Sequence, residues 1–280
     1  MLAKAYIEIT TFCGLDCDFC KPAKTPSRQM SLSLFEKINK ELAGKTKSLA
    51  YHILGDPLSV DNLGLYLDIS ASYGHSVELT TSGRYLKNID KTLLAHPSIR
   101  QINFSLSSFF ANKNFGLELG EYMDKIIDFC LFSIERPKRF VNLRLWNIGD
   151  DRYLSFNQDI EKIIERKLSK PLYINQKARI APYTMIVKDT MFGWPSIKNN
   201  ISSTTGSCHA VSSQLGFLVD GRVVPCCLDT RGDIELGNIN KQALSEIAAS
   251  PRAAKMVNGF KQGVLVENLC QTCDFRETRL

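Results

Sequence analysis

The feature that most constrains the fold is an alternation of short apolar, strand-like runs with longer amphipathic stretches over the first two-thirds of the chain. This alternation is typical of repeated strand–helix units around a parallel sheet. It predicts six strands, at residues 5–10, 48–54, 76–81, 100–107, 140–146 and 172–175. It predicts helices between them, at residues 32–43, 62–73, 90–95, 119–135 and 155–167, the first capped by Ser31.

Six such units predict an α/β fold, a partial (β/α)6 TIM-like barrel over residues 1–190, with its chemistry at the carboxyl ends of the strands. Residues 191–206 are rich in Gly, Pro, Asn, Ser and Thr and predict a connector. From 207 to 280 we expect a small α+β domain that binds a metal cluster. Within it we predict a hairpin of residues 214–219 and 222–225 around Asp220-Gly221, and a helix at 242–249.

Composition narrows the class of protein. With 280 residues, 44% of them hydrophobic, the chain can bury a full core. No apolar run approaches the roughly 20 residues that span a bilayer, and residues 1–4 lack the layout of a secretory signal, so we expect a cytoplasmic protein without a membrane partner. Reduced thiols are the rule there, and nine cysteines then indicate metal rather than disulfides. The net charge of +6 is compatible with an anionic partner, but no basic block supports nucleic-acid binding.

A first group of cysteines follows the first predicted strand directly. Cys13, Cys17 and Cys20 form a CxxxCxxC arrangement on a loop that contains Gly14. Iron–sulfur clusters usually take a cysteine on every iron, so three thiolates would leave one iron of a cubane open to another ligand. The alternative is a zinc site, but zinc favours paired CxxC spacings and a fourth ligand, and the next histidine is His52.

The triad resembles that of the radical S-adenosylmethionine (SAM) superfamily, in which CxxxCxΦC carries an aromatic residue where Phe19 stands. The resemblance implies that Cys13, Cys17 and Cys20 are the catalytic residues and hold a [4Fe–4S] cluster whose open iron binds SAM. One electron would then cleave SAM to methionine and a 5′-deoxyadenosyl radical. A one-electron donor such as flavodoxin or ferredoxin is the implied protein partner.

Shorter matches to the same superfamily follow at successive strand ends. Gly55-Asp56-Pro57-Leu58 stands where the family has Gly-Gly-Glu-Pro, Thr80-Thr81-Ser82-Gly83 matches a Thr-Thr-Asn-Gly turn, and Ser105-Leu106-Ser107 matches Ser-Leu-Asp. Each alone is also typical of an ordinary turn or strand end. Arg144 in the fifth strand faces either the barrel or solvent, and its fork of donors suits a carboxylate. The resemblance thus implies SAM contacts from Phe19, Gly55, Asp56, Pro57, Thr81, Ser105, Ser107 and Arg144.

A second group of four cysteines lies in the predicted C-terminal domain: Cys208, Cys226, Cys270 and Cys273. Four thiolates saturate a cluster, and the spacing resembles the SPASM domain found behind many radical SAM barrels. The chain ends seven residues after Cys273, which resembles the shortened twitch form with one auxiliary [4Fe–4S] cluster. The alternative is a zinc site of four cysteines. Cys227 either shares the ligand role of Cys226 or is a small buried residue, and Cys130 is expected in the core.

Three functional hypotheses follow. The first is a redox enzyme that dehydrogenates a small molecule, in which the auxiliary cluster takes the remaining electron. The second is a radical SAM enzyme that modifies a peptide, a protein or tRNA. The third is a non-catalytic metal-binding protein. The substrate is unknown, and polar barrel residues are expected to contact it, namely Asn103, Asn142, Arg144, Asn175 and Arg179. Trp146 and Trp194 are expected to be packing anchors.

Overall fold

Ten strands and eight α-helices are present in the part of the chain that the computed structural model describes, residues 1–20, 26–86, 90, 92–134, 139–169, 171–172 and 174–276. The strands are β1 (Lys4–Ile7), β2 (Ser48–Tyr51), β3 (Ser76–Thr81), β4 (Ile99–Ser105), β5 (Phe140–Ile148), β6 (Lys177–Ala181), β7 (Thr184–Thr190), β8 (Gln214–Phe217), β9 (Arg222–Val224) and β10 (Gly237–Asn238). The α-helices are α1 (Leu32–Leu42), α2 (Leu63–Ser72), α3 (Ser107–Phe110), α4 (Leu119–Ile134), α5 (Leu154–Leu168), α6 (Leu244–Ala248), α7 (Pro251–Lys261) and α8 (Asn268–Gln271).

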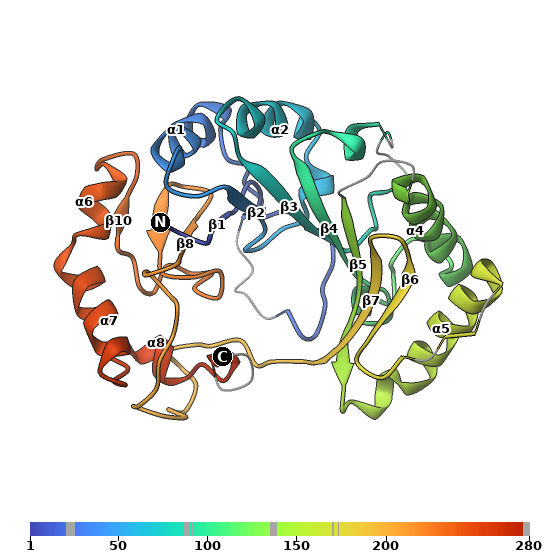
Figure 1. Cartoon of the computed structure of the whole chain (residues 1–280). Coiled ribbons are helices and arrows are strands. Elements are labelled where there is room, and N and C mark those ends of the chain that lie inside the picture. The colour runs from blue at the N-terminus through green and yellow to red at the C-terminus, as the bar shows by residue number, and fades with distance from the viewer. Residues whose placement is uncertain are drawn as a thin grey trace.

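The strands join into one sheet in the order β10-β9-β8-β1-β2-β3-β4-β5-β7-β6. The sheet curves into an open arc, with α1, α2, α4 and α5 on its outer side (Figure 1). Parallel pairings run from β1 through β5 to β7, which gives six parallel strands. The predicted α/β fold, a partial barrel of six parallel strands, is therefore confirmed.

The predicted sixth strand at residues 172–175 is wrong. Leu172 and Ile174 lie outside any strand, and Tyr173 lies outside the described residues. Its place beside β5 is taken by β7, which forms an antiparallel hairpin with β6. Strand β7 is longer than the run of three apolar residues at 172–174, and its Ile186 is completely buried. It is therefore better suited to a position inside the sheet.

Most of the other predicted elements are found with small changes. The 76–81 strand has the predicted bounds, and the strands that begin near residues 5, 48, 100 and 140 differ by at most three residues at an end. The predicted helix at 90–95 is wrong, since it reduces to a 3-10 turn at Leu93–Ala95 shortly before Pro97. The sequence reading missed α7, although Ser250 caps it and Pro251 opens it.

Helix α1 illustrates how the outer layer is fixed. Ser31 accepts a hydrogen bond from the backbone N–H of Leu34 at 3.2 Å, so the predicted cap is confirmed. Phe35 is fully buried and meets the rings of Tyr51 and Tyr66 edge-on at centroid distances of 5.5 and 4.9 Å. Burying such an aromatic side chain stabilises the fold by about 2–3 kcal/mol. Phe35 therefore packs α1 against both β2 and α2.

The C-terminal segment continues the barrel sheet. Strand β8 pairs in parallel with β1, with Tyr6 opposite Gly216, and β8 and β9 form the predicted hairpin. The predicted helix at 242–249 appears as α6. Residues 191–206 form no helix or strand apart from one isolated bridge at Thr205, and they cross from β7 to the C-terminal segment (Figure 1). The division into domains at this connector stays a prediction.

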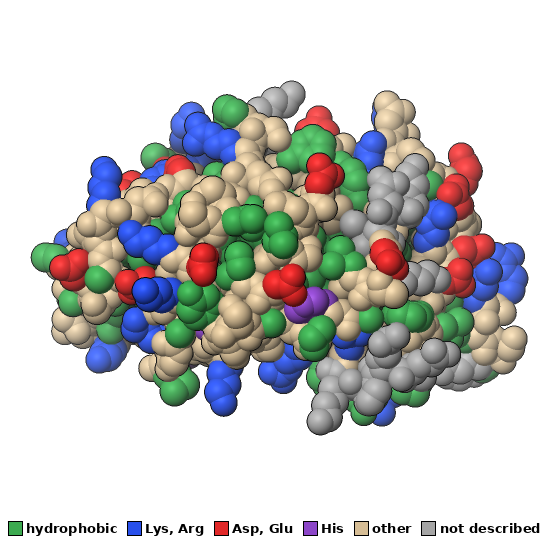
Figure 2. All heavy atoms as spheres, turned by 90° about the horizontal axis from the view of Figure 1, so that it is seen from above, with side chains coloured by type: hydrophobic (Ala, Val, Ile, Leu, Met, Phe, Trp, Pro, Cys, Tyr) green, Lys and Arg blue, Asp and Glu red, His purple; other side chains and the backbone are tan. Residues whose placement is uncertain are grey.

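Charges of both signs are interspersed on the face shown in Figure 2. In the described part of the chain, no helix combines the length and the apolar character required to cross a bilayer.

Candidate active site

The three N-terminal cysteines lie on the loop of residues 11–20, here named the cysteine loop, which follows β1. All three line a cavity of about 570 Å³ at the end of the sheet. Most of the other predicted cofactor contacts line the same cavity: Phe19, Gly55, Asp56, Thr81, Ser105, Ser107 and Arg144. Pro57 is buried beside it and does not line the cavity. The fold thus brings together nearly all the residues that the sequence singled out near SAM.

Two glycines allow the cysteine loop to pack closely. Gly14 has φ +69°, and a Cβ there would overlap the Tyr85 hydroxyl. Gly55 has φ +73°, and a Cβ there would overlap the carbonyl group of Thr10. Both positions need glycine for its left-handed backbone and for lack of space. Gly55 therefore brings the end of β2 directly against the cysteine loop.

Side chains from the following strand ends hold this loop. Tyr85 donates a hydrogen bond from its hydroxyl to the carbonyl oxygen of Cys13 at 2.9 Å, and Arg84 donates to that of Gly14 at 3.0 Å. Asn112 accepts from the backbone N–H of Asp16 at 2.7 Å. The sequence reading missed these three residues, because ordinary Arg, Tyr and Asn residues in loops carry no motif that points to a distant backbone.

The thiols of the cysteine loop influence one another. Burial raises the pKa of Cys13 to about 12, with further contributions from Asp56 and the other two cysteines. Burial likewise raises the pKa of Cys20 to about 11, and Cys17 adds to this. The thiols are thus protonated at neutral pH until a metal centre supplies the positive charge that favours thiolates. Three sulfurs that line the same cavity fit the three-cysteine cluster that the sequence predicts.

Asp56 stands where the radical SAM pattern has a glutamate, and its carboxylate is hydrogen-bonded to other residues of the protein. Its buried carboxylate accepts hydrogen bonds from the Thr81 hydroxyl at 2.7 Å, the Ser82 hydroxyl at 2.7 Å and the Ser82 backbone N–H at 2.9 Å. It also caps a 3-10 turn at Pro57–Ser59, accepting from the backbone N–H of Leu58 at 3.0 Å. The Asp56 and Thr81 side chains tie the end of β2 to the end of β3, so a cofactor contact from this segment would come from its backbone.

The opposite wall offers polar groups that face the cavity. Ser105 and Arg144 are register partners on β4 and β5, and both line the cavity, which settles the orientation of Arg144 toward the barrel. The Arg144 guanidinium lies 4.8 Å from the centre of the Trp146 ring. Ser107 lines the cavity too, and its buried hydroxyl has no hydrogen-bond partner among the described residues. A buried hydroxyl without a partner is costly, and a bound polar ligand would satisfy it.

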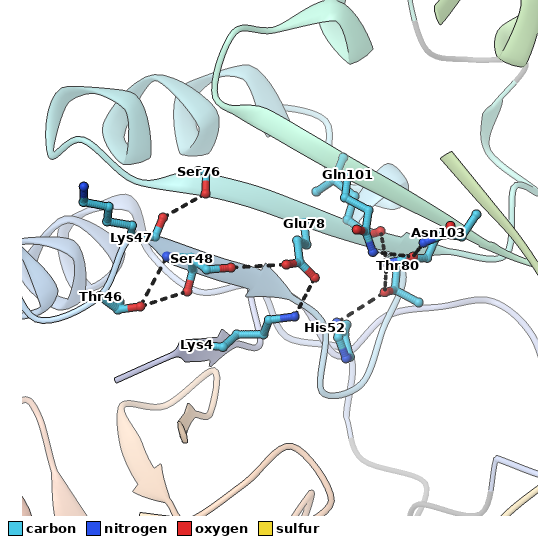
Figure 3. Close-up of polar contacts among 12 residues, drawn as sticks. Lys4, Thr46, Lys47, Ser48, His52, Ser76, Glu78, Thr80, Gln101 and Asn103 are labelled. Atoms are coloured by element: carbon cyan, nitrogen blue, oxygen red, sulfur yellow. Dashed lines mark hydrogen bonds and ion pairs between the residues drawn. The ribbon is translucent and has the colours of Figure 1, made fainter. Parts of the chain in front are cut away.

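A polar cluster of Lys4, His52, Glu78 and Thr80 (Figure 3) also lines the cavity. Lys4 pairs with Glu78 at 2.7 Å, and the His52 Nδ1 lies 3.3 Å from the Thr80 hydroxyl. Burial, together with the positive charges of Arg144 and Lys4, lowers the pKa of His52 to about 3. The imidazole is therefore neutral at physiological pH. The sequence reading missed this cluster because its members come from three different strands or strand ends.

Among the predicted substrate contacts, Arg144 lines the cavity. Trp146 and Trp194, which were expected to be packing anchors, line it as well. Asn103 is buried and donates to the carbonyl of Leu79 at 3.2 Å, and it accepts a hydrogen bond from Asn142 at 3.0 Å. These two asparagines, like Asn175 and Arg179, do not line the cavity. Their expected role as substrate contacts stays a prediction without support from the geometry.

The four C-terminal cysteines form a second electrostatically coupled group. Burial raises the pKa of Cys270 to about 12, and Cys208 and Cys273 add to the effect. Burial also raises the pKa of Cys226, with contributions from Cys227, Cys270 and Cys208. Among the described residues, no three Cys, His, Asp or Glu side chains are arranged to hold a single metal ion. That result concerns a single ion, whereas a cubane spreads its thiolates over four irons.

Cys227 and Cys130 have different surroundings. Cys227 lines the barrel cavity and is hydrogen-bonded to the phenol of Tyr6 on β1. It therefore lines the same cavity as the N-terminal cysteines rather than a closed core. Cys130 is buried on α4, so its predicted place in the core is confirmed.

Comparisons with known proteins agree with both parts of this site. Residues 208–274 match the family model of SPASM, described as an iron–sulfur cluster-binding domain. The C-terminal segment is therefore similar to SPASM domains. Its four predicted cysteine ligands all fall within the matched residues. No curated protein matches the chain.

Solved structures resemble the whole chain at low identity. The structure of BtrN in complex with AdoMet and 2-DOIA has a TM-score of 0.62 at 17% identity, covering 98% of this chain and 93% of BtrN. That of anSMEcpe with bound AdoMet and Cp18Cys peptide has a TM-score of 0.62 at 12% identity, covering 99% and 88% of the two chains. Streptococcus suis SuiB bound to precursor peptide SuiA gives 0.55 at 14% identity, covering 98% and 71%. The prediction of a radical SAM barrel with a SPASM-like domain behind it is thus confirmed as to fold.

Proposed function

We propose that this chain is a radical SAM enzyme. Cys13, Cys17 and Cys20 would hold the catalytic [4Fe–4S] cluster, and Cys208, Cys226, Cys270 and Cys273 would hold the auxiliary one. When bound, the catalytic cluster supplies the electron that splits SAM into methionine and a 5′-deoxyadenosyl radical. The observation that carries the proposal is the meeting of the cysteine triad with the predicted SAM-binding strand ends on the wall of one cavity.

SAM would lie between the cysteine loop and the ends of β2, β4 and β5. The backbone of Gly55 and Asp56 is available because the Asp56 side chain is already used by Thr81 and Ser82. The Ser107 hydroxyl needs a partner, and the Arg144 guanidinium provides the donors that a carboxylate accepts. These residues bind and orient the cofactor in the proposal, while Phe19 and Trp146 add apolar walls that exclude water.

For the net reaction we propose dehydrogenation of a small hydroxylated molecule. A substrate hydrogen atom would pass to the deoxyadenosyl radical, the hydroxyl proton to a protein base or water, and the remaining electron to the auxiliary cluster. A cavity of about 570 Å³ lies in the range of small-molecule sites, about 300–1,000 Å³. The polar cluster supports this class of substrate because neutral His52 and Thr80 can exchange hydrogen bonds with a hydroxyl group.

The test is anaerobic turnover with SAM, dithionite and alcohols that carry deuterium on the carbinol carbon. The proposal predicts deuterium in 5′-deoxyadenosine together with the matching carbonyl product. The Cys17→Ala variant should form neither compound, whereas Cys130→Ala, which changes a buried cysteine far from both groups, should form both. Deoxyadenosine without label or oxidised product, across a broad set of alcohols, would contradict the dehydrogenase.

Modification of a peptide is the second candidate. It is supported by the two structural neighbours whose structures contain peptides, anSMEcpe and SuiB. Incubation with peptides encoded near the gene would decide between the two functions. Label that moves from a peptide Cα or Cβ to deoxyadenosine would favour this candidate over the dehydrogenase.

A further inference from the structure

Asn112, in the loop after α3, contacts the cysteine loop with both ends of its side-chain amide. Its Oδ1 accepts from the backbone N–H of Asp16 at 2.7 Å, and its Nδ2 donates to the Sγ of Cys17 at 3.0 Å. The same Nδ2 also donates to the carbonyl oxygen of Ser108 at 2.8 Å. All three bonds involve one short side chain, so they hold α3 and the cysteine loop in a fixed relation.

These contacts determine which end of the amide faces the sulfur. If the amide were turned over, its oxygen would face the Ser108 carbonyl oxygen and its NH2 group would face the Asp16 N–H. Both contacts would be repulsive, because they would pair acceptor with acceptor and donor with donor. The orientation that satisfies every partner places an N–H donor against Cys17.

The three sulfurs of the triad differ in their hydrogen bonds. The Sγ of Cys17 accepts a hydrogen bond from the Asn112 amide at 3.0 Å and another from the Ser108 side chain. Cys13 receives a backbone hydrogen bond from Leu15. Cys20 receives no hydrogen bond from the described residues. A donor facing a thiolate withdraws electron density from it and favours the reduced, more negative state of an attached cluster.

We propose that Asn112 is a positioning residue that acts through Cys17 to raise the reduction potential of the N-terminal cluster. The inference rests on the proposed function, since it requires the cluster. The effect opposes that of the buried Asp56 carboxylate, whose negative charge disfavours a thiolate at Cys13. In this account a weak biological donor can reduce the cluster because Asn112 partly offsets that charge.

Two variants separate the donor from the loop contact. Asn112→Asp keeps an oxygen for the Asp16 N–H but removes the N–H that faces Cys17. Asn114→Asp is the matched control, because it adds the same charge to the same loop. The Asn114 side chain is exposed and makes no hydrogen bond with the described residues, and only its backbone carbonyl accepts from Arg84.

The experiment is a potentiometric titration of anaerobically reconstituted protein, followed by electron paramagnetic resonance, with iron and sulfide counted in each sample. At the midpoint potential of the wild type, the reduced fraction of the N-terminal cluster should be several-fold smaller in N112D than in N114D. In wild-type protein labelled with ¹⁵N-asparagine, the reduced cluster should show a ¹⁵N hyperfine coupling that N112D lacks. Equal midpoints in N112D and N114D, or a coupling that persists in N112D, would overturn the inference.

Failure of the inference and failure of the proposed function give different results. Wild-type protein that takes up no iron would contradict the proposed function itself. Wild-type protein with a cluster whose potential ignores the N112D change would contradict only the role of Asn112. If N112D held no cluster, the ¹⁵N coupling in the wild type would decide alone, and its absence would overturn the inference.

Discussion

At the scale of single residues, the site depends on buried polar groups that are hydrogen-bonded within the protein itself. Asp56 lies where the SAM-binding segment of the family carries a glutamate, yet its carboxylate accepts hydrogen bonds from Thr81, Ser82 and Leu58. The tie between two strand ends fixes the backbone that would face the cofactor. Its position in a motif therefore predicted a cofactor contact, whereas the side chain itself ties two strand ends together.

Replacing Asp56 by asparagine should destabilise the fold by about 3 kcal/mol. The amide has one acceptor oxygen, and its NH2 group would face donors from Thr81 or Ser82, which leaves buried groups unsatisfied. Asp128→Asn is the control, because Asp128 is exposed on α4, and it should change the free energy of unfolding by at most about 0.5 kcal/mol. Urea unfolding of both variants measures the difference, and equal stabilities would contradict the structural role of Asp56.

Glu8 gives a prediction about pH. It is buried between β1 and the β8–β9 hairpin, where Val219 donates its backbone N–H to the carboxylate at 3.0 Å. Burial raises the pKa of Glu8 from 4.5 to about 7, against which the Val219 hydrogen bond acts. The folded state thus binds more protons than the unfolded state between pH 4.5 and 7, and Glu8 lowers stability as pH rises through this window.

The Glu8→Gln variant removes this titration. The unfolding free energy of the wild type should therefore fall relative to the variant between pH 5 and pH 8, by at most about 3 kcal/mol. Urea unfolding at several pH values measures the difference between the two proteins, in which other titrating groups cancel. A constant difference over this range would contradict the raised pKa.

At the scale of elements, regular periodicity and short motifs were enough to predict most strands and helices of the barrel. The 76–81 strand and the Ser31 cap of α1 were read from local patterns, and the structure has both. The β6–β7 hairpin was missed because burial against β5, and not local pattern, selects β7 as the sixth strand. The contacts of Asn112 and the polar cluster around His52 were missed because they join residues that only the curvature of the sheet brings together.

The packing of the cysteine loop against β2 is tested by Gly55→Ala. The new Cβ would overlap the Thr10 carbonyl, and alanine disfavours the φ of +73°, so the loop should shift and iron content should fall. Gly120→Ala in α4 is the control, because nothing lies near its Cβ position. That substitution should leave iron content unchanged and stabilise the fold by about 0.5–1 kcal/mol. Full iron loading of G55A would contradict the close packing.

At the scale of the whole molecule, the SPASM-like segment and the barrel share one sheet. Strand β8 covers the edge of β1, and the fully buried Phe217 contributes to the same core as the barrel strands. This arrangement brings Cys227 to the cavity beside Tyr6. The two cysteine groups thus belong to one sheet-based body, in which β8 extends the sheet beyond β1.

Truncation after residue 206 should therefore leave a barrel that does not persist as a monomer. The unpaired edge of β1 and the apolar surface once covered by Leu215 and Phe217 would both face solvent, a combination that favours aggregation. Size-exclusion chromatography and thermal unfolding of the truncated chain measure this. A monomer with the melting temperature of the full chain would show that the barrel does not need β8.

The central claim, that three N-terminal cysteines hold a cluster open to SAM, is tested most directly by iron analysis and electron paramagnetic resonance of anaerobic protein. We predict about eight irons per wild-type chain, four for each cluster, and a spectrum that changes when SAM is added. Joint replacement of Cys13, Cys17 and Cys20 by alanine should leave about four irons and abolish the response to SAM. Wild-type protein without iron, or a loaded protein whose spectrum ignores SAM, would contradict the account.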